Sequence, residues 1–262
     1  MMQKKWILVT GGSRGIGAAL VQHLAREYDV VFTWKDQQSR AESLLNECRA
    51  LSLSVSGYRC DGSKPTEVKA LAQQLLTQYG APFGIIHNAG ITRDALHFKQ
   101  DINDWETLIG TNLNAVFYWN QQLLPSMMEQ GSGSIVMISS VSALKGNIGQ
   151  VAYSASKAAM LGMARSLARE VARFNIRVTC VLPGLIETEM TTQMSDREQK
   201  ALKTAIPLRR LGRANEVAQA TAYLISEASS YMTGQSLVLD GGMSACRSSP
   251  SCNNAIKLHG VT

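Results

Sequence analysis

The stretch that decides the fold is WILVTGGSRGIGAAL, residues 6–20. An apolar β-type run leads directly into glycines, and a helical pattern begins among them. Gly11, Gly15 and Gly17 give the spacing G-x-x-x-G-x-G. This spacing suits a tight turn, a close approach of backbone to a pyrophosphate, and a helix N-terminus aimed at its charge. A P-loop would end in Gly-Lys-Ser/Thr, but two alanines follow Gly17 here. The stretch predicts dinucleotide binding, with a plain glycine-rich strand–helix turn as the alternative.

Strand-like and helix-like segments alternate along the whole chain. Short apolar runs predict strands at 6–10, 30–34, 55–60, 83–88, 134–139, 176–182 and 236–240. Segments of helical length lie between them, at about 15–28, 37–51, 65–79, 103–130, 151–174 and 214–226. This alternation predicts an α/β fold in a single domain, with a doubly wound, seven-stranded parallel sheet and helices on both faces.

Two segments interrupt the alternation. Residues 187–212 follow the end of a strand and include a polar, Met-bearing stretch, which predicts a lid insertion over a site. Residues 246–262 are polar and show little periodicity, which predicts a loose tail. We therefore expect residues 1–245 to form the dinucleotide-binding domain.

The composition is that of a globular protein with a sizeable core. Of its 262 residues, 45% are hydrophobic and 18% are charged. The five cysteines are scattered and form no C-x-x-C pair, which argues against a disulfide framework or a zinc site, so we expect no metal. No apolar stretch approaches the ~20 residues of a membrane helix, and the first apolar run is too short for a signal peptide. These features predict a cytoplasmic protein with no membrane partner.

The net charge of +6 bears on the kind of partner the protein binds. Such a surplus attracts phosphates, anionic cofactors or an acidic protein. No cluster of five or more Lys and Arg residues occurs in the sequence, and no aromatic–basic pattern resembles a nucleic-acid motif. We therefore do not expect nucleic acid as a partner.

The residues after the second predicted strand bear on the choice of dinucleotide. An acidic residue there would bind the ribose hydroxyls of NAD, whereas a basic residue would accommodate the 2′-phosphate of NADP. The strand closes with Trp34, Lys35 follows, and Arg14 lies in the glycine-rich loop. These two cations predict NADP(H), although Asp36, one residue further on, argues for NAD.

A second informative stretch is SSVSALKGNIGQVAYSASK, residues 139–157. Tyr153 and Lys157 are four residues apart and would share one face of a helix. Ser140 ends the apolar run that precedes them. A strand end, a loop and a helix start could thus bring the three side chains together.

These motifs together resemble the short-chain dehydrogenases/reductases, and most closely the 3-oxoacyl-[acyl-carrier-protein] reductases. The resemblance covers residues 6–243 and is carried by TGGSRGIG (10–17), CDGS (60–63), NAG (88–90), ITRDAL (91–96), TNL (111–113), SS (139–140), YSASK (153–157), PGLIETEM (183–190) and TGQSLVLDGGM (233–243). It implies a Rossmann fold and a catalytic tetrad of Asn112, Ser140, Tyr153 and Lys157. Tyr153 would donate a proton to the substrate oxygen and Ser140 would orient that oxygen. Lys157 would supply positive charge and bind the nicotinamide ribose, and Asn112 would anchor a water.

The resemblance also implies which residues bind the NADP(H) cofactor. They come from the glycine-rich loop, the ends of several strands and the catalytic helix: Gly11, Ser13, Arg14, Gly15, Ile16, Gly17, Lys35, Asp61, Asn88, Ala89, Gly90, Tyr153, Lys157, Pro183, Gly184, Ile186 and Thr188. Asp61 would meet the adenine edge. Ile186 and Thr188 would hold the nicotinamide carboxamide.

The function implied is NADPH-dependent reduction of a 3-oxoacyl thioester, bound to acyl carrier protein, in fatty-acid or polyketide-type biosynthesis. The usual assembly of such enzymes is a homotetramer. Two alternatives remain open: the same chemistry on a free small molecule, such as an acyl-CoA, a sugar or a cyclic ketone, and a catalytically silent regulatory member.

Two departures from the family bear on these expectations. His87 stands where many relatives have a second asparagine, and we interpret it as a tolerated substitution rather than a base. The turn at residues 129–131 is Glu-Gln-Gly, where relatives that serve acyl carrier protein often have Lys or Arg. Arg209, Arg210 and Arg213 near the lid are alternative cations for docking a carrier.

Overall fold

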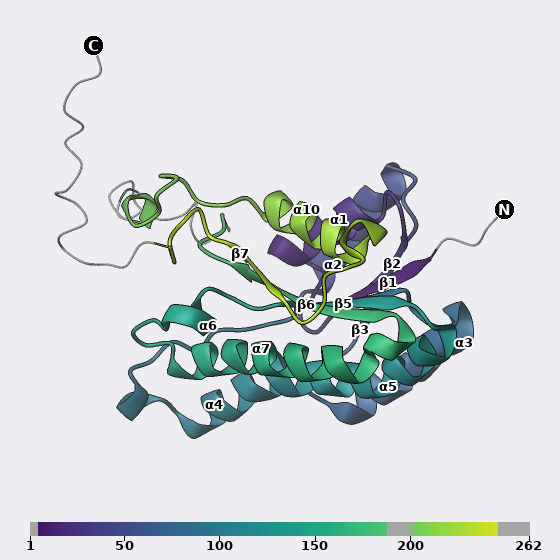
Figure 1. Ribbon diagram of the computed structural model, residues 1–262, viewed down its shortest axis with the longest axis horizontal. Coiled ribbons are helices and arrows are strands. Elements are labelled where there is room, and N and C mark those ends of the chain that lie inside the picture. The colour runs from purple at the N-terminus through teal and green to yellow at the C-terminus, as the bar shows by residue number, and fades with distance from the viewer. Residues whose placement is uncertain (1–4, 188–199, 201, 246–262) are drawn as a thin grey trace, which may run out of the picture.

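The computed structural model describes residues 5–187, 200 and 202–245. Within these residues, seven strands form one sheet in the order β3-β2-β1-β4-β5-β6-β7, and every pairing is parallel (Figure 1). The strands are β1 Trp6–Val9, β2 Asp29–Trp34, β3 Val55–Arg59, β4 Gly84–His87, β5 Gly133–Ile138, β6 Ile176–Pro183 and β7 Ser236–Leu239. The predicted doubly wound sheet is thereby confirmed.

Helices cover both faces of this sheet. The α-helices are α1 Gly15–Leu24, α2 Gln38–Ala50, α3 Pro65–Tyr79, α4 Ile102–Ile109, α5 Ala115–Gln130, α6 Ser142–Lys145, α7 Val151–Val171 and α10 Ala214–Ile225. Figure 1 shows α1, α2 and α10 on one side of the sheet and α3, α5 and α7 on the other. Two hydrophobic clusters correspond to these two sides.

The strands read as continuous apolar runs because each face of the sheet is buried. Successive side chains on a strand point to opposite faces. Accordingly, Leu8 packs with the cluster under α3, α5 and α7, whereas Ile7 and Val9 pack with the cluster under α1, α2 and α10. All three side chains are fully buried.

The order of the strands determines where a ligand can bind. From β1 the chain winds outward to β2 and β3, and it then returns to β4 on the other side of β1. In open parallel sheets of this kind, ligands bind beyond the carboxyl ends of the strands where the winding reverses. The glycine-rich turn after β1 and the residues after β4 meet at this point.

The structure corrects one predicted helix and adds another. The segment 103–130 was expected as one helix, but α4 and α5 are separated by a π-helical turn over Gly110–Asn114. Such turns occur inside helices and frequently lie at functional sites. The short helix α6 was not predicted. Half of the expected lid (187–212) and the whole of the expected tail (246–262) lie outside the described residues.

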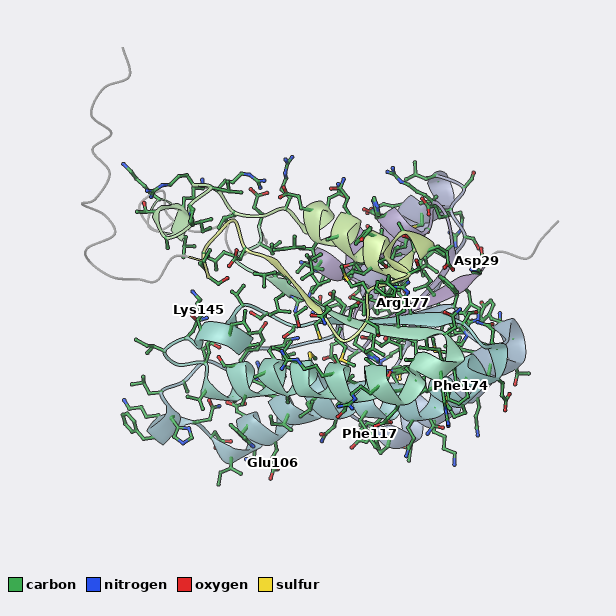
Figure 2. The ribbon with its side chains drawn as sticks, in the orientation of Figure 1. Asp29, Glu106, Phe117, Lys145, Phe174 and Arg177 are labelled. Carbon is green, nitrogen blue, oxygen red and sulfur yellow. The ribbon has the colours of Figure 1, made fainter. Side chains whose placement is uncertain are left out.

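Arg177 on β6 holds the end of α10 against the sheet, and Figure 2 labels it between the two. Its guanidinium donates hydrogen bonds to the carbonyl oxygens of Leu224 (2.7 Å), Ile225 (3.0 Å) and Ser226 (3.0 Å). The last carbonyl groups of a helix have no partner within the helix and carry partial negative charge. A buried cation therefore stabilises this helix end, and α10 packs along α1.

We expect Arg177→Met to lower the free energy of unfolding by about 2–4 kcal/mol, because it removes the charge-assisted hydrogen bonds to three carbonyl groups at the end of α10, of which Leu224 and Ser226 keep neutral donors. Denaturant unfolding measures this change. The matched control is Arg169→Met, since Arg169 is exposed on α7, and it should change stability little. Equal effects of the two substitutions would contradict the proposed role of Arg177.

Candidate active site

The glycine-rich turn is packed too tightly for any side chain at two of its glycines. Gly11 has φ +66°, and a Cβ atom there would lie 2.8 Å from the Cα of Ala89. At Gly17, in the first turn of α1, a Cβ atom would collide with the backbone oxygen of Gly11 and lie 2.7 Å from Asn88 Nδ2. The turn therefore lies directly against the residues that follow β4.

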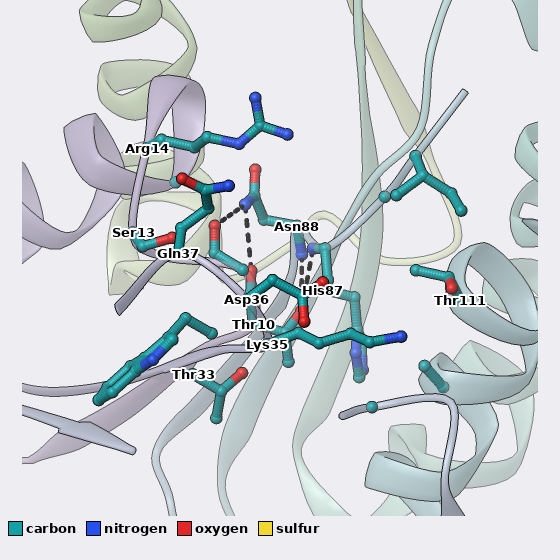
Figure 3. Close-up of a pocket in the computed structure, with 18 of the residues that line it drawn as sticks. Thr10, Ser13, Arg14, Thr33, Lys35, Asp36, Gln37, His87, Asn88 and Thr111 are labelled. Carbon is teal, nitrogen blue, oxygen red and sulfur yellow. Dashed lines mark hydrogen bonds between the residues drawn. The ribbon is translucent and has the colours of Figure 1, made fainter. Parts of the chain in front are cut away.

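Hydrogen bonds from Thr10 and Asn88 join the ends of β1 and β4. The Thr10 hydroxyl accepts the backbone N–H groups of Asn88 (3.0 Å) and Ala89 (3.1 Å). In return, Asn88 Nδ2 donates to the carbonyl oxygens of Thr10 (3.0 Å) and Gly11 (2.9 Å) (Figure 3). Thr10 was not predicted as a site residue, although it opens the TGGSRGIG motif.

A cavity of about 930 Å³ opens beside this turn. This volume falls within the range of small-molecule sites, roughly 300–1,000 Å³. The residues expected to bind cofactor that line it are Gly11, Ser13, Arg14, Gly15, Ile16, Gly17, Lys35, Asp61, Asn88, Ala89 and Gly90. The structure thus brings most of the predicted set to one cavity.

Two of the remaining predicted cofactor residues, Tyr153 and Lys157, are not among the residues that line this cavity. The residues that line the cavity do not include Pro183, Gly184 or Ile186. Ile186 instead pairs with Gly212 and lines a second cavity of about 260 Å³. Thr188 lies outside the described residues.

Lys35 and Asp61 form an ion pair at the cavity, with 2.9 Å between Nζ and Oδ2. Partial burial opposes ionisation of Asp61, but hydrogen bonds from Ser63 and the contact with Lys35 outweigh it and hold the pKa of Asp61 below its usual value. Figure 3 shows Arg14 and Lys35 among the lining residues, and Arg93 also lines the cavity.

The structure brings together Ser140, Tyr153 and Lys157, as their spacing predicts. Lys157 is buried in α7 and its ammonium donates to the carbonyl oxygen of Ile138, at the end of β5, over 2.8 Å. The same ammonium lies 5.7 Å from the centroid of the Tyr153 ring. Ser140 lies close enough to the Tyr153 side chain to lower the pKa of its hydroxyl.

Burial sets the protonation states of Lys157 and Tyr153. It lowers the pKa of Lys157 to about 8, because a charged group loses hydration in the interior. Burial also raises the pKa of Tyr153 above its usual value; Asp94 adds to the rise and the hydrogen bond with Ser140 opposes it. At neutral pH, Tyr153 is therefore protonated and Lys157 is mostly charged.

Asn112 lies in the π-helical turn and is completely buried. Its Oδ1 accepts the backbone N–H of Ile91 (2.8 Å), and its Nδ2 donates to the carbonyl oxygen of Ile91 (3.0 Å) and to the Ser156 hydroxyl (3.1 Å). These bonds tie the chain after β4 to α7. Ser156, one residue before Lys157, was not predicted as a site residue.

Gly90 connects the cavity to two of the four catalytic candidates, which are Asn112, Ser140, Tyr153 and Lys157. It lines the cavity, and a Cβ atom at Gly90 would lie 3.2 Å from Lys157 Nζ and 3.5 Å from Asn112 Oδ1. Lys157, the charged neighbour of the candidate acid, is thus adjacent to the dinucleotide-sized cavity.

His87 does not act as a base in this arrangement. It is buried at the end of β4, and its Nε2 lies 2.8 Å from Asn120 Oδ1 on α5. Burial lowers the pKa of His87 to about 4, against an opposing effect of the bond to Asn120. The neutral ring therefore ties β4 to α5.

The described residues contain no group of three or more His, Cys, Asp and Glu side chains placed to hold a metal ion. None of their helices has the length and apolar character that crossing a membrane requires.

Comparison with known proteins is consistent with this geometry. The model of a family described as enoyl-(acyl carrier protein) reductase, one of the short-chain dehydrogenases/reductases, matches residues 11–244. The chain belongs to the short-chain dehydrogenase/reductase family. It is accordingly an oxidoreductase of a family that uses a nicotinamide cofactor. The tight glycine turn and the cavity beside it fit such a dinucleotide.

Curated relatives match this chain over almost its whole length. The 3-oxoacyl-[acyl-carrier-protein] reductase FabG of Staphylococcus aureus (strain N315) is 38% identical over 244 residues, which are 93% of this chain and 99% of the relative. FabG of Thermotoga maritima is 38% identical over 242 residues, 92% of this chain and 98% of the relative. FabG of Chlamydia pneumoniae is 38% identical over 239 residues, 91% of this chain and 96% of the relative.

We expect Gly17→Ala to raise the Kd for the nicotinamide cofactor at least tenfold, because overpacking of this kind costs about 1–3 kcal/mol. The added methyl group must displace the Gly11 carbonyl from the turn. Quenching of protein fluorescence by the reduced cofactor measures the Kd. Gly162→Ala is the control, since a Cβ atom there meets nothing within 4 Å. Unchanged binding by Gly17→Ala would contradict the placement of the pyrophosphate at this turn.

Proposed function

We propose that the protein uses NADPH to reduce the keto group of a 3-oxoacyl thioester, carried by acyl carrier protein, in fatty-acid or polyketide-type biosynthesis. The observation that carries the proposal is the convergence of Ser140, Tyr153 and Lys157 beside the dinucleotide-sized cavity. The names of the curated relatives support the substrate class.

The protein's side chains donate the proton of this reaction and stabilise the charge that remains, and the bound cofactor supplies the hydride. Tyr153 is protonated at neutral pH and donates its proton to the substrate oxygen. Ser140 donates a hydrogen bond to that oxygen and holds it in place. The charged Lys157 stabilises the tyrosinate that remains, since an opposite charge nearby favours the ionised form.

Asn112 acts in this proposal as a support for the site. Its side-chain amide is engaged with Ile91 and Ser156. It thereby holds the chain after β4 beside Lys157 and fixes the first turns of α7. Its bonds favour this positioning role over direct contact with the substrate.

The preference for NADPH rests on Arg14 and Lys35, which both border the cavity. A 2′-phosphate would compete with Asp61 for Lys35, because Lys35 and Asp61 already form an ion pair. Asp61 then weakens the attraction of Lys35 for the phosphate, Asp36 at the same cavity opposes it too, and Arg14 supplies the second positive charge. The combined arrangement favours NADPH less strongly than two free cations would.

The charges of the lid-side arginines bear on the docking of a carrier. Arg210 forms a two-point contact with Glu216, at 2.7 and 2.8 Å, and the backbone N–H of Arg213 also donates to Glu216. This carboxylate offsets the positive charge of the lid-side arginines. Together with the uncharged turn at 130–131, it weakens the attraction for an acidic carrier and makes a free thioester the second candidate substrate.

The proposed assembly is a homotetramer of closed symmetry. Large apolar side chains are exposed on the outer elements that would pair, including Phe117 on α5, which is 51% exposed, and Val238 on the edge strand β7, which is 37% exposed. Figure 2 labels Phe117 on the helical layer formed by α5 and α7. A second copy would cover these side chains.

The experiment that tests the function is NADPH oxidation with a 3-oxoacyl thioester in two forms, carrier-bound and free, beside a panel of unrelated ketones. We expect both thioesters to be reduced and the unrelated ketones to be poor substrates. Preference for the free thioester would favour the second candidate substrate. Reduction of unrelated ketones alone, or of nothing, would overturn the thioester proposal.

We expect replacement of both Arg14 and Lys35 by alanine to reduce the preference for NADPH over NADH by an order of magnitude or more, since a charge-assisted hydrogen bond contributes about 1.5–3 kcal/mol. The ratio of kcat/KM for the two cofactors measures the preference. The control is Lys64→Ala, because Lys64 is an exposed cation near Asp61 that pairs with Glu67. Equal use of both cofactors by the wild type would contradict the assignment.

A further inference from the structure

Four hydrogen-bonded contacts in a row lead from Ser140 to the carboxylate of Asp94. The row runs from Ser140 to Ser142 (3.2 Å between the hydroxyl oxygens), then to Asn147 (2.9 Å), Gln150 (2.9 Å) and Asp94 (2.9 Å). It crosses the segment between β5 and α7 and ends in the loop after β4. Figure 1 shows this segment, with α6, beside the first turn of α7.

The two loops that carry these side chains are also joined through their backbones. The N–H of Ala95 donates to the carbonyl oxygen of Gly149 over 2.9 Å. Gly149 has φ +79°, a conformation that favours glycine. The backbone therefore places Gln150 opposite Asp94 independently of the side-chain contacts.

Each contact in the row has a direction that follows from the chemistry of its groups. A carboxylate only accepts hydrogen bonds, so Asp94 fixes Gln150 with its amide nitrogen toward Asp94 and its oxygen toward Asn147. The Gln150 oxygen can only accept a hydrogen bond, so the side chain of Asn147 directs its amide nitrogen toward Gln150. The same nitrogen then donates its second proton to the Ser142 hydroxyl.

The direction matters at the Ser140 end of the row. Ser140 Oγ accepts the backbone N–H of Ser142 (3.1 Å), and its hydroxyl donates to that of Ser142 (3.2 Å). Hydroxyl protons rotate to suit their partners, so this contact can reverse when a ketone oxygen binds beside Ser140. Because Asn147 also donates to the Ser142 hydroxyl, Ser142 keeps a donor after the Ser140 proton has turned to the substrate, and Ser142 can then donate to Ser140.

We propose that Ser142, Asn147 and Gln150 are positioning residues, anchored by Asp94, that orient the Ser140 hydroxyl as a donor to the substrate oxygen. The inference rests on the proposed reduction of a ketone, but it does not depend on which ketone is reduced. A donor oriented in advance aids the reaction because no reorganisation is needed as charge develops on the oxygen. Loss of the orientation should therefore lower kcat and leave cofactor binding intact.

The test is a double-mutant cycle with Ser142→Ala and Asn147→Ala, measured with any ketone that the wild-type enzyme reduces. Each single variant should lower kcat about 10-fold, the factor that corresponds to one hydrogen bond of ordinary strength. The double variant should show the same loss of about 10-fold, because both changes interrupt one row. The KM for NADPH and the Tm should remain close to those of the wild type. Ile148→Ala is the control, since Ile148 lies on the same loop and is 94% exposed.

Three results would overturn the inference. Losses that multiply in the double variant would show that the residues act independently. A raised KM for NADPH or a lowered Tm that accounts for the loss would show a structural role only. A kcat close to that of the wild type in both single variants would show that Ser140 needs no support. A wild type that reduces thioesters poorly but another ketone well would leave this test in place and overturn only the proposed substrate.

Discussion

The contact between the buried ammonium of Lys157 and the carbonyl oxygen of Ile138 is the constraint on which the site depends. Burying a charge is costly unless polar groups compensate for it. Here the carbonyl group at the end of β5 does so, and the Ser139 hydroxyl, which donates to the Lys157 carbonyl oxygen over 2.8 Å, holds α7 against that strand end. The position of the charge, and with it that of Tyr153 one turn earlier, is therefore set by the sheet.

The parallel sheet places the other parts of the site along the same edge. All of its strands end on one side, so the glycine turn after β1, the Asn88 contacts after β4 and the Ser140 segment after β5 converge without long-range loops. Helices that pack beside this edge of the sheet then hold the site residues in place through hydrogen bonds. The π-helical turn between α4 and α5 turns Asn112 toward Ile91, and α7 presents Ser156 to the same amide.

Features that depend on local pattern could be predicted from the sequence. The central strands are apolar on both faces, and the spacing of Tyr153 and Lys157 follows from helical geometry alone. Features that depend on contacts between distant segments could not. The helix break at Gly110–Asn114 accompanies bonds to Ile91, the ion pair of Lys35 and Asp61 joins the ends of two strands, and the row from Ser140 to Asp94 crosses two loops. None of these leaves a periodic signal in the sequence.

The most direct test of the account is the rate of hydride transfer in a single turnover of Tyr153→Phe. The substitution removes the hydroxyl and keeps the ring beside Lys157, so we expect the Kd for NADPH to change little and the chemical step to slow by about 10²–10⁴-fold, the usual contribution of a positioned proton donor. Stopped-flow absorbance of the reduced nicotinamide measures this step apart from product release. A step near the wild-type rate would contradict the assignment of Tyr153 as the acid and the role given to the buried charge of Lys157.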